Sequence, residues 1–386
     1  MNLLRISFLL SLVTGFTTSC STLEKWNQSE KRVFNIEKRW VRTTLTSENL
    51  TFRKANRMTP IIAGSLLIQG NALDSISAFD RSTGTRVWTL KIKGGVEGGA
   101  VAAGDHLFFG ANDGSFYAVS LQTGAILWTF PTRSETLSAP TLHNGVVFFL
   151  AGNNVVYALE AETGKQLWLY SKQDPQNLSI RGGSKPSISA TGKTLFVGFS
   201  DGSLVSLDVA NGGLKWEKQL SQNKRFRDID SSPVRDAEIL YVPGFDDALY
   251  AIRSTNGDIL WKYEKGGYGD LIINMDRIYY STTNNEVVCL EKSTGKELWS
   301  YKLIGGLGTQ PVYTRGLVVV GESQGHVIFL DANSGRKVGQ FESGLGVLSP
   351  ISADDKLSEI YFISNEANLY SLRATWKNGK TFFPWL

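Results

Sequence analysis

The chain has 386 residues, of which 42% are hydrophobic and 20% charged, and its formal net charge is +4. This composition provides ample apolar surface for a core and argues against general disorder, and the small net charge argues against a strong nucleic-acid-binding field. The 39 glycines and 10 tryptophans are typical of many short strands joined by tight turns, so one large all-β domain fits this length.

The first twenty residues have the pattern of an export signal. Arg5 precedes an apolar stretch from Ile6 to Val13 that is too short to span a bilayer as a permanent helix. The following "TTSC" resembles a bacterial lipobox, whose cysteine, here Cys20, becomes the acylated first residue of the mature protein. The alternative to a lipobox is an ordinary signal peptide with an incidental cysteine. If Cys20 is acylated, Ser21 after it resembles a signal for sorting to the outer membrane. We therefore expect a signal peptide over residues 1–19 and a lipidated linker over residues 20–34.

Basic residues are frequent between residues 31 and 57, and we interpret them as a solvated face rather than a phosphate-binding patch. With Cys20 modified, Cys289 is the only remaining cysteine, so no intrachain disulfide is expected.

An eleven-residue motif then recurs along the chain. It has a small residue, a turn of Asp, Asn, Ser or Thr followed by Gly, and a final Trp, as in "AFDRSTGTRVW" at residues 78–88. Its glycines are 38 to 48 residues apart, which is the length of one four-stranded propeller blade. They are Gly84, Gly124, Gly164, Gly212, Gly257, Gly295 and Gly335.

Each copy predicts two strands joined by a tight turn, in which Gly supplies a positive φ without a Cβ penalty. A second β-rich pair lies upstream of each copy, and a proline usually opens it, where no ladder hydrogen bond is lost. The seventh copy, at residues 329–339, keeps Gly335 and has Gly339 in place of Trp. We interpret the tryptophans as packing between blades rather than as a ligand-binding stripe, and Cys289 as a small buried packing residue rather than a nucleophile.

The seven units are followed by a partial one from Pro350, which lacks its last strand, and "EKRWVRT" around Trp40 can supply that strand. We therefore predict an all-β fold, an eight-bladed β-propeller of four-stranded antiparallel blades over residues 35–373, closed by an N-terminal strand. We expect residues 374–386 to form an aromatic C-terminal tail.

Two consecutive connections between blades are longer than most of the others. The distance from the closing Trp to the next Pro is 12 residues at Trp128, but 18 at Trp168 and 17 at Trp216. The connection after Trp40 is also long, at 20 residues, but carries mostly basic residues. Connections of this kind leave the same face of a propeller, and loops on a rigid scaffold commonly carry binding sites.

We call the two long connections, from Trp168 to Pro186 and from Trp216 to Pro233, the inserted linkers. Their side chains have complementary chemistry. The first linker carries apolar side chains beside an arginine, whose planar guanidinium offers a fork of hydrogen-bond donors, and the second carries carboxylates. This combination is typical of a protein-binding hot spot. The alternative is that the arginine pairs with a carboxylate and only rigidifies the rim. The candidate partner-binding residues are Leu178, Ile180, Arg181, Asp228 and Asp230. The sequence contains no metal-spaced histidine set and no common catalytic motif, so we expect no enzyme activity, catalytic residue, metal or cofactor.

The repeat resembles that of propellers related to pyrroloquinoline-quinone (PQQ) dehydrogenases, but the chain lacks the vicinal cysteine pair of those enzymes. A resemblance over nearly the whole chain is to the BamB family of the outer-membrane β-barrel assembly (BAM) machinery. That family has L-S-L-R-G and D-V-D-x-x-P stretches, which are "LSIRG" at residues 178–182 and "DIDSSP" at residues 228–233 here.

The BamB resemblance implies a non-enzymatic, lipid-anchored scaffold at the periplasmic face of the outer membrane. It also implies binding to the POTRA domains of BamA and assistance to folding and insertion of outer-membrane proteins, with unfolded client proteins as further candidate partners. The alternatives are a PQQ-dependent dehydrogenase-like or small-ligand-binding periplasmic propeller, and an adhesion or signalling propeller.

Overall fold

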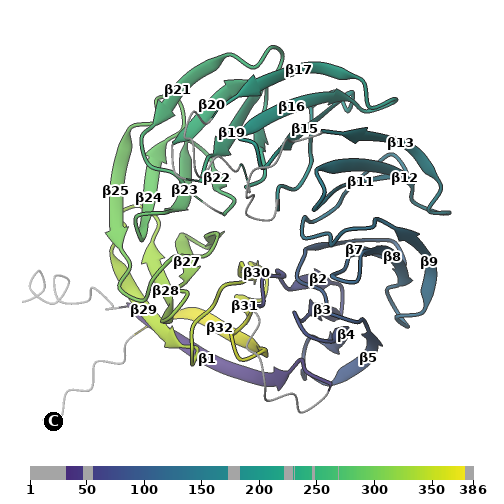
Figure 1. Cartoon of the computed structure of the whole chain (residues 1–386). Helices are drawn as coiled ribbons and strands as arrows, with labels where there is room; N and C mark the ends of the chain where they lie inside the picture. The colour runs from purple at the N-terminus through teal and green to yellow at the C-terminus, as the bar shows by residue number, and fades with distance from the viewer. Residues whose placement is uncertain are drawn as a thin grey trace, which may run out of the picture. The chain divides into compact units, whose positions relative to one another are not determined.

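The computed structural model describes residues 32–46, 55–172, 183–220, 229, 231–245, 248–267 and 269–378. Within this part of the chain the secondary structure is entirely β, and the strands form eight sheets of four antiparallel strands. Figure 1 shows these sheets as the blades of a ring, in chain order. The prediction of an eight-bladed β-propeller is confirmed.

Blades 1 to 4 are meanders, in which strands adjacent in the sequence are adjacent in the sheet. Blade 1 contains β2 (Ile61–Ala63), β3 (Leu66–Gly70), β4 (Ser75–Asp80) and β5 (Arg86–Lys91). Blade 2 contains β6 (Ala100–Ala103), β7 (His106–Gly110), β8 (Ser115–Ser120) and β9 (Ile126–Pro131). Blade 3 contains β10 (Thr141–His143), β11 (Val146–Ala151), β12 (Val155–Glu160) and β13 (Gln166–Ser171). Blade 4 contains β14 (Ser187–Ile188), β15 (Thr194–Gly198), β16 (Ser203–Asp208) and β17 (Leu214–Gln219).

Blades 5 to 7 repeat this order, and blade 8 departs from it. Blade 5 contains β18 (Val234–Asp236), β19 (Ile239–Pro243), β20 (Leu249–Arg253) and β21 (Ile259–Tyr263). Blade 6 contains β22 (Ile272–Asn274), β23 (Arg277–Thr282), β24 (Glu286–Glu291) and β25 (Glu297–Lys302). Blade 7 contains β26 (Val312–Thr314), β27 (Leu317–Gly321), β28 (His326–Asp331) and β29 (Lys337–Glu342). Blade 8 contains β30 (Ser352–Asp354), β31 (Glu359–Ile363), β32 (Asn368–Asn378) and, beside β32, the N-terminal strand β1 (Arg32–Thr43).

The propeller unit runs from Ile36 to Ala374, and the described ends of β1 and β32 beyond it belong to a separate small unit. In that small unit the rings of Phe34 and Trp376 lie 5.2 Å apart. No helix among the described residues is long and apolar enough to cross a membrane.

Seven of the described tryptophans pack on the turn glycine of the following blade, and they are Trp40, Trp88, Trp128, Trp168, Trp216, Trp261 and Trp299. A Cβ atom on Gly124 would lie 2.6 Å from the Trp88 ring, and φ at this glycine is +71°, so only Gly fits beneath the indole. The indole N–H of Trp88 donates to the Leu121 carbonyl at 2.9 Å, and Trp40, Trp128, Trp168, Trp216 and Trp299 form the same type of bond to their next blades. The tryptophans therefore stabilise blade-to-blade packing, as predicted.

This pairing explains why the seventh copy of the motif has no tryptophan. The ring of Trp40 on β1 covers Gly84 of blade 1, so β1 supplies the tryptophan of blade 8. Blade 8 has no turn between a third and a fourth strand, because its outer strand comes from the N-terminus. Gly339 therefore has no glycine turn to cover, and Phe329 lies opposite it where a small residue faces Trp in the earlier blades.

Candidate functional site

The five candidate partner-binding residues lie outside the described residues. They are Leu178, Ile180, Arg181, Asp228 and Asp230, and Cys20 lies outside them as well. Their roles therefore stay predictions. The described residues at the ends of the two inserted linkers do show where each linker leaves and rejoins the ring.

The first inserted linker begins at a charged cluster between blades 3 and 4. Lys172 Nζ lies 2.6 Å from a carboxylate oxygen of Asp201 and 2.6 Å from one of Glu217, and it also contacts Ser203 Oγ. Burial alone would lower the pKa of Lys172, but hydrogen bonds to the two carboxylates raise it above its usual value. The start of this linker is therefore fixed across two blades.

The second linker is anchored by its one described internal residue, Ile229. Its side chain is buried against blades 4 and 5 among Phe196, Leu240 and Val242, and its amide donates to the Phe199 carbonyl at 3.2 Å. An apolar anchor between the two carboxylates of "DID" explains why this stretch has an isoleucine at its centre.

Buried serines then fix the end of each linker to its own blade. The Oγ of Ser184 accepts a hydrogen bond from the Gly198 amide at 3.1 Å, and Ser231 Oγ donates to the Pro243 carbonyl at 2.5 Å. The same position is Ser138, Thr309 and Ser349 in blades 3, 7 and 8, and each of these bonds the end of the second strand in its blade. Sequence analysis identified the recurring proline and missed this hydroxyl two residues before it, although "SAP", "SKP" and "SSP" show it.

The ends of the two inserted linkers meet directly. The Lys185 amide donates to Ser232 Oγ at 3.0 Å, and the Ser232 amide donates to Asp270 Oδ1 at 2.5 Å. These bonds join three consecutive blades, 4, 5 and 6. The described ends of the two linkers are therefore neighbours in the ring.

Lys185, Ser232 and Asp270 also line a cavity of about 400 Å³. A residue one or two positions before the first strand of each blade contributes to it, so all eight blades surround the cavity. These eight residues are Thr59, Gly99, Ala139, Lys185, Ser232, Asp270, Gln310 and Pro350. Because side chains alternate along an extended segment, residues two positions earlier, such as Arg57, Glu97, Leu137 and Leu348, line the same cavity.

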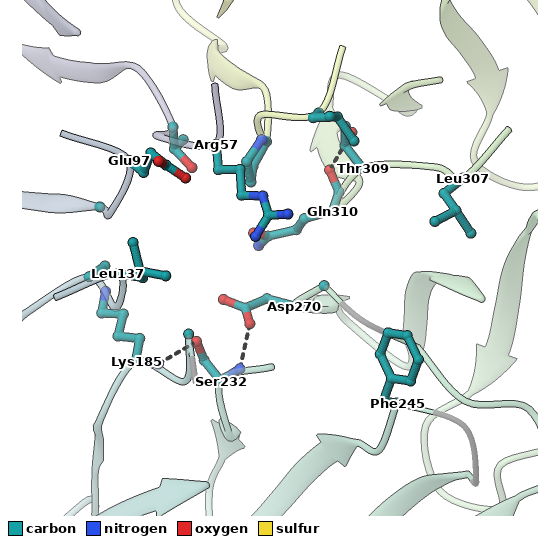
Figure 2. A pocket seen from close by; sticks show the side chains of 17 residues that line it. Arg57, Glu97, Leu137, Lys185, Ser232, Phe245, Asp270, Leu307, Thr309 and Gln310 are labelled. Atoms are coloured by element: carbon teal, nitrogen blue, oxygen red, sulfur yellow. Dashed lines mark hydrogen bonds between the residues drawn. The ribbon is translucent and has the colours of Figure 1, made fainter. Parts of the chain in front are cut away.

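The charged groups of this cavity differ in their surroundings. Glu97 accepts a hydrogen bond from the Asn112 side-chain amide at 2.9 Å, whereas Arg57 has no ion pair or hydrogen bond with another described residue. Figure 2 shows the Arg57, Gln310 and Asp270 side chains pointing into the same space. Burial raises the pKa of Asp270, and the Ser232 hydrogen bonds and the Lys185 charge only partly oppose that effect.

Other reactive side chains give no second site. Cys289 is fully buried opposite Trp299, and burial raises the pKa of its thiol to about 11, so its interpretation as a packing residue is confirmed. His106, His143 and His326 lie in blades 2, 3 and 7. Over the described residues no group of three His, Cys, Asp or Glu side chains is arranged to hold a metal ion.

The fold is shared with solved structures of different activity. BamB from Moraxella catarrhalis superimposes with a TM-score of 0.75 and 20% identity, covering 88% of this chain and 100% of that chain. A quinohemoprotein alcohol dehydrogenase from Pseudomonas putida superimposes with a TM-score of 0.73 and 14% identity, covering 90% of this chain and 77% of that one. At these identities the likeness shows the fold alone.

Sequence comparison is more specific. The outer membrane protein assembly factor BamB of Kangiella koreensis is 37% identical over 332 residues, which are 83% of this chain and 84% of that protein. The BamB of Yersinia pestis is 33% identical over 193 residues, about half of either chain. Residues 73–288 and 273–375 match the family model described as outer membrane protein assembly factor BamB. The predicted resemblance is thus confirmed, and the chain belongs to the BamB family of outer membrane protein assembly factors.

Proposed function

We propose that this chain is a non-enzymatic scaffold of the BAM complex that binds BamA through its two inserted linkers. In this role it assists the folding and insertion of outer-membrane proteins. Membership of the BamB family supports the assembly role, and the paired linkers supply a surface that the regular blades lack.

The hydrogen bond from the Lys185 amide to Ser232 Oγ carries the proposal, because it joins the ends of the two linkers. Arg181 lies four residues before Lys185, and Asp230 lies two before Ser232. Each is therefore tethered by a short stretch of chain to a fixed point. Such a pair can present an arginine fork and carboxylates together to a POTRA domain of BamA, with Leu178 and Ile180 as apolar anchors.

We further propose that Cys20 carries the lipid and holds the propeller at the periplasmic face of the outer membrane. Several acyl chains on one residue give stable anchoring, since each buried CH₂ contributes roughly 0.8 kcal/mol. Loss of membrane association in a Cys20→Ala protein that still binds BamA in solution would separate the anchor from the binding surface.

The binding surface is tested by capture of BamA on the immobilised propeller. We expect Arg181→Ala and Asp228→Ala each to weaken capture about tenfold or more, the effect of losing a charged interface hot spot. Lys93→Ala and Glu264→Ala are matched controls, because both residues are exposed on other connections between blades, and these variants should retain capture. Unchanged BamA capture by both linker variants would refute the proposed surface.

A dehydrogenase role is less well supported by the residues present. The two cysteines of the chain, Cys20 and Cys289, are not adjacent in sequence. The described carboxylates lining the cavity, Glu97 and Asp270, form no three-residue metal-binding group with other described residues. This donor set does not fit a calcium-bound quinone. A purified protein that reduces a dye with added alcohols and PQQ would overturn the non-enzymatic assignment.

A further inference from the structure

The cavity surrounded by the eight blades is lined by a positively charged side chain, Arg57, whose charge is not paired within the described part of the chain. Arg57 is exposed, and neither an ion pair nor a hydrogen bond links its side chain to another described residue. Its guanidinium points into the cavity, as the Gln310 side chain also does (Figure 2). An unpaired guanidinium offers a planar fork of donors that matches a carboxylate with two parallel hydrogen bonds.

The acidic side chains of the cavity do not neutralise this site. Glu97 is turned to the Asn112 amide, with 2.9 Å between nitrogen and oxygen. One oxygen of Asp270 accepts a hydrogen bond from the Ser232 amide at 2.5 Å, and no ion pair links Asp270 to Arg57. Lys185 contributes a second cation to the lining. The Arg57 guanidinium therefore stays available to an anion that enters the cavity.

Much of the remaining lining is apolar. Leu137, Leu307 and Leu348 face the cavity from blades 3, 7 and 8, and Gly99 and Ala139 leave space beside them. A volume of about 400 Å³ is within the range of small-molecule sites, which usually combine apolar walls with a few polar groups that fix orientation.

We propose that this cavity binds a small organic carboxylate with an apolar body. The carboxylate lies on Arg57 and the Gln310 amide, and the apolar body lies against Leu137 and Leu348. This site is separate from the proposed BamA surface and does not require BamA. Lys185 and Ser232, which line it, are nevertheless the last residues of the two linkers, so an occupied cavity contacts the base of both.

Calorimetric titration of the purified mature lipoprotein in detergent tests the site. The probe is 4-phenylbutyrate, and 4-phenylbutanol and 4-phenylbutylamine carry the same body with a neutral and a cationic head. We expect saturable binding of the acid, and binding at least about tenfold weaker for the other two compounds and for the acid to Arg57→Gln. Arg336→Gln is the matched control, because Arg336 is an exposed arginine on the β28–β29 turn, and it should bind the acid normally.

A second variant locates the ligand. Ala139→Phe places a ring into the cavity without changing its charge, and we expect it to abolish binding of the acid while the melting curve stays cooperative. The proposal is wrong if the amine or the alcohol binds as well as the acid, if Arg57→Gln binds normally, if Ala139→Phe binds normally, or if no binding of 4-phenylbutyrate is detected.

Discussion

Ion pairs join neighbouring blades both at the seam between blades 8 and 1 and at the junction between blades 3 and 4. The two regions differ in how far apart in the sequence the paired residues lie. At the seam, Arg81 pairs with Asp354 and Glu359 and donates to Tyr361 Oη at 2.8 Å, so residues more than 270 positions apart are joined. Beside blade 4, Lys172 joins Glu217 only 45 positions away. The seam must offset the entropy of closing the whole ring, whereas the junctions hold neighbours that the chain already keeps together.

This difference shows where the fold can accept extra residues. The inserted linkers interrupt the chain between blades, yet Trp168 still covers Gly212 and Trp216 still covers Gly257 as in the regular junctions. The tryptophan, serine and seam contacts therefore hold neighbouring blades together at regular and inserted junctions alike.

The largest effect is expected from removing the tryptophan of the seam. Trp40→Ala empties the space over Gly84 and loosens the only strand of blade 8 that comes from the N-terminus, and we expect a loss of about 3–5 kcal/mol in the free energy of unfolding. Urea unfolding measures this loss. The control is Trp376→Ala, because Trp376 is 43% exposed and should cost less than about 1 kcal/mol. Equal losses in the two variants would contradict the role of the seam.

A smaller, pH-dependent effect is expected at the ion pairs of the seam. Burial alone would raise the pKa of Asp354, but its hydrogen bond to Arg81 lowers the pKa below 3.8. This pairing therefore stabilises the fold above pH 3.8 and is lost as the pH falls through the lowered value. We expect Arg81→Met to cost about 2–4 kcal/mol at neutral pH.

Acid unfolding of the two proteins checks the sign of this dependence. The stability of the Arg81→Met protein should fall less steeply than that of the unmodified chain at pH values below 3.8. Parallel acid curves would show that Asp354 does not depend on Arg81.

Two serine variants allow an inserted junction to be compared with a regular one, since Ser184 lies at the end of an inserted linker and Ser138 at the end of a regular connection. Ser184→Ala and Ser138→Ala each leave a buried amide without its acceptor, at Gly198 and Leu150, and each should cost about 1–3 kcal/mol. Of these two serines only Ser184 lies at the end of an inserted linker, so we expect only Ser184→Ala to weaken BamA capture as well. If both variants bind BamA equally, the base of the linker does not control the binding surface.

The smallest effect is expected at Asp270, and it is stabilising. Because burial raises its pKa above 3.8, this carboxyl destabilises the fold progressively as the pH rises from 3.8 through the raised value, and the full cost remains at higher pH. Asp270→Asn keeps an oxygen for the Ser232 amide, and we expect it to gain about 1 kcal/mol at pH 7. Thermal unfolding should show this gain shrinking as the pH approaches 3.8, and a gain independent of pH would contradict it.

Much of this fold could be predicted from sequence because the repeat pairs a tryptophan with a glycine at a fixed distance. The closure by β1 could also be predicted, since Trp40 has no glycine turn before it. The cavity could not be predicted, because Arg57, Gln310 and Asp270 come from three blades and share no motif. The serine two residues before the proline was available in the sequence, but its purpose depends on a partner 12 residues further on.

The pairing of β1 with β32 also sets an order on maturation of the chain. The first strand of the propeller finds its partner only after the last strand has been made, so every earlier intermediate carries an open edge at each end. Closing so long a loop is slow compared with forming a single blade. The ring is therefore completed in one late step, and a chain truncated before β32 would leave β1 without its sheet.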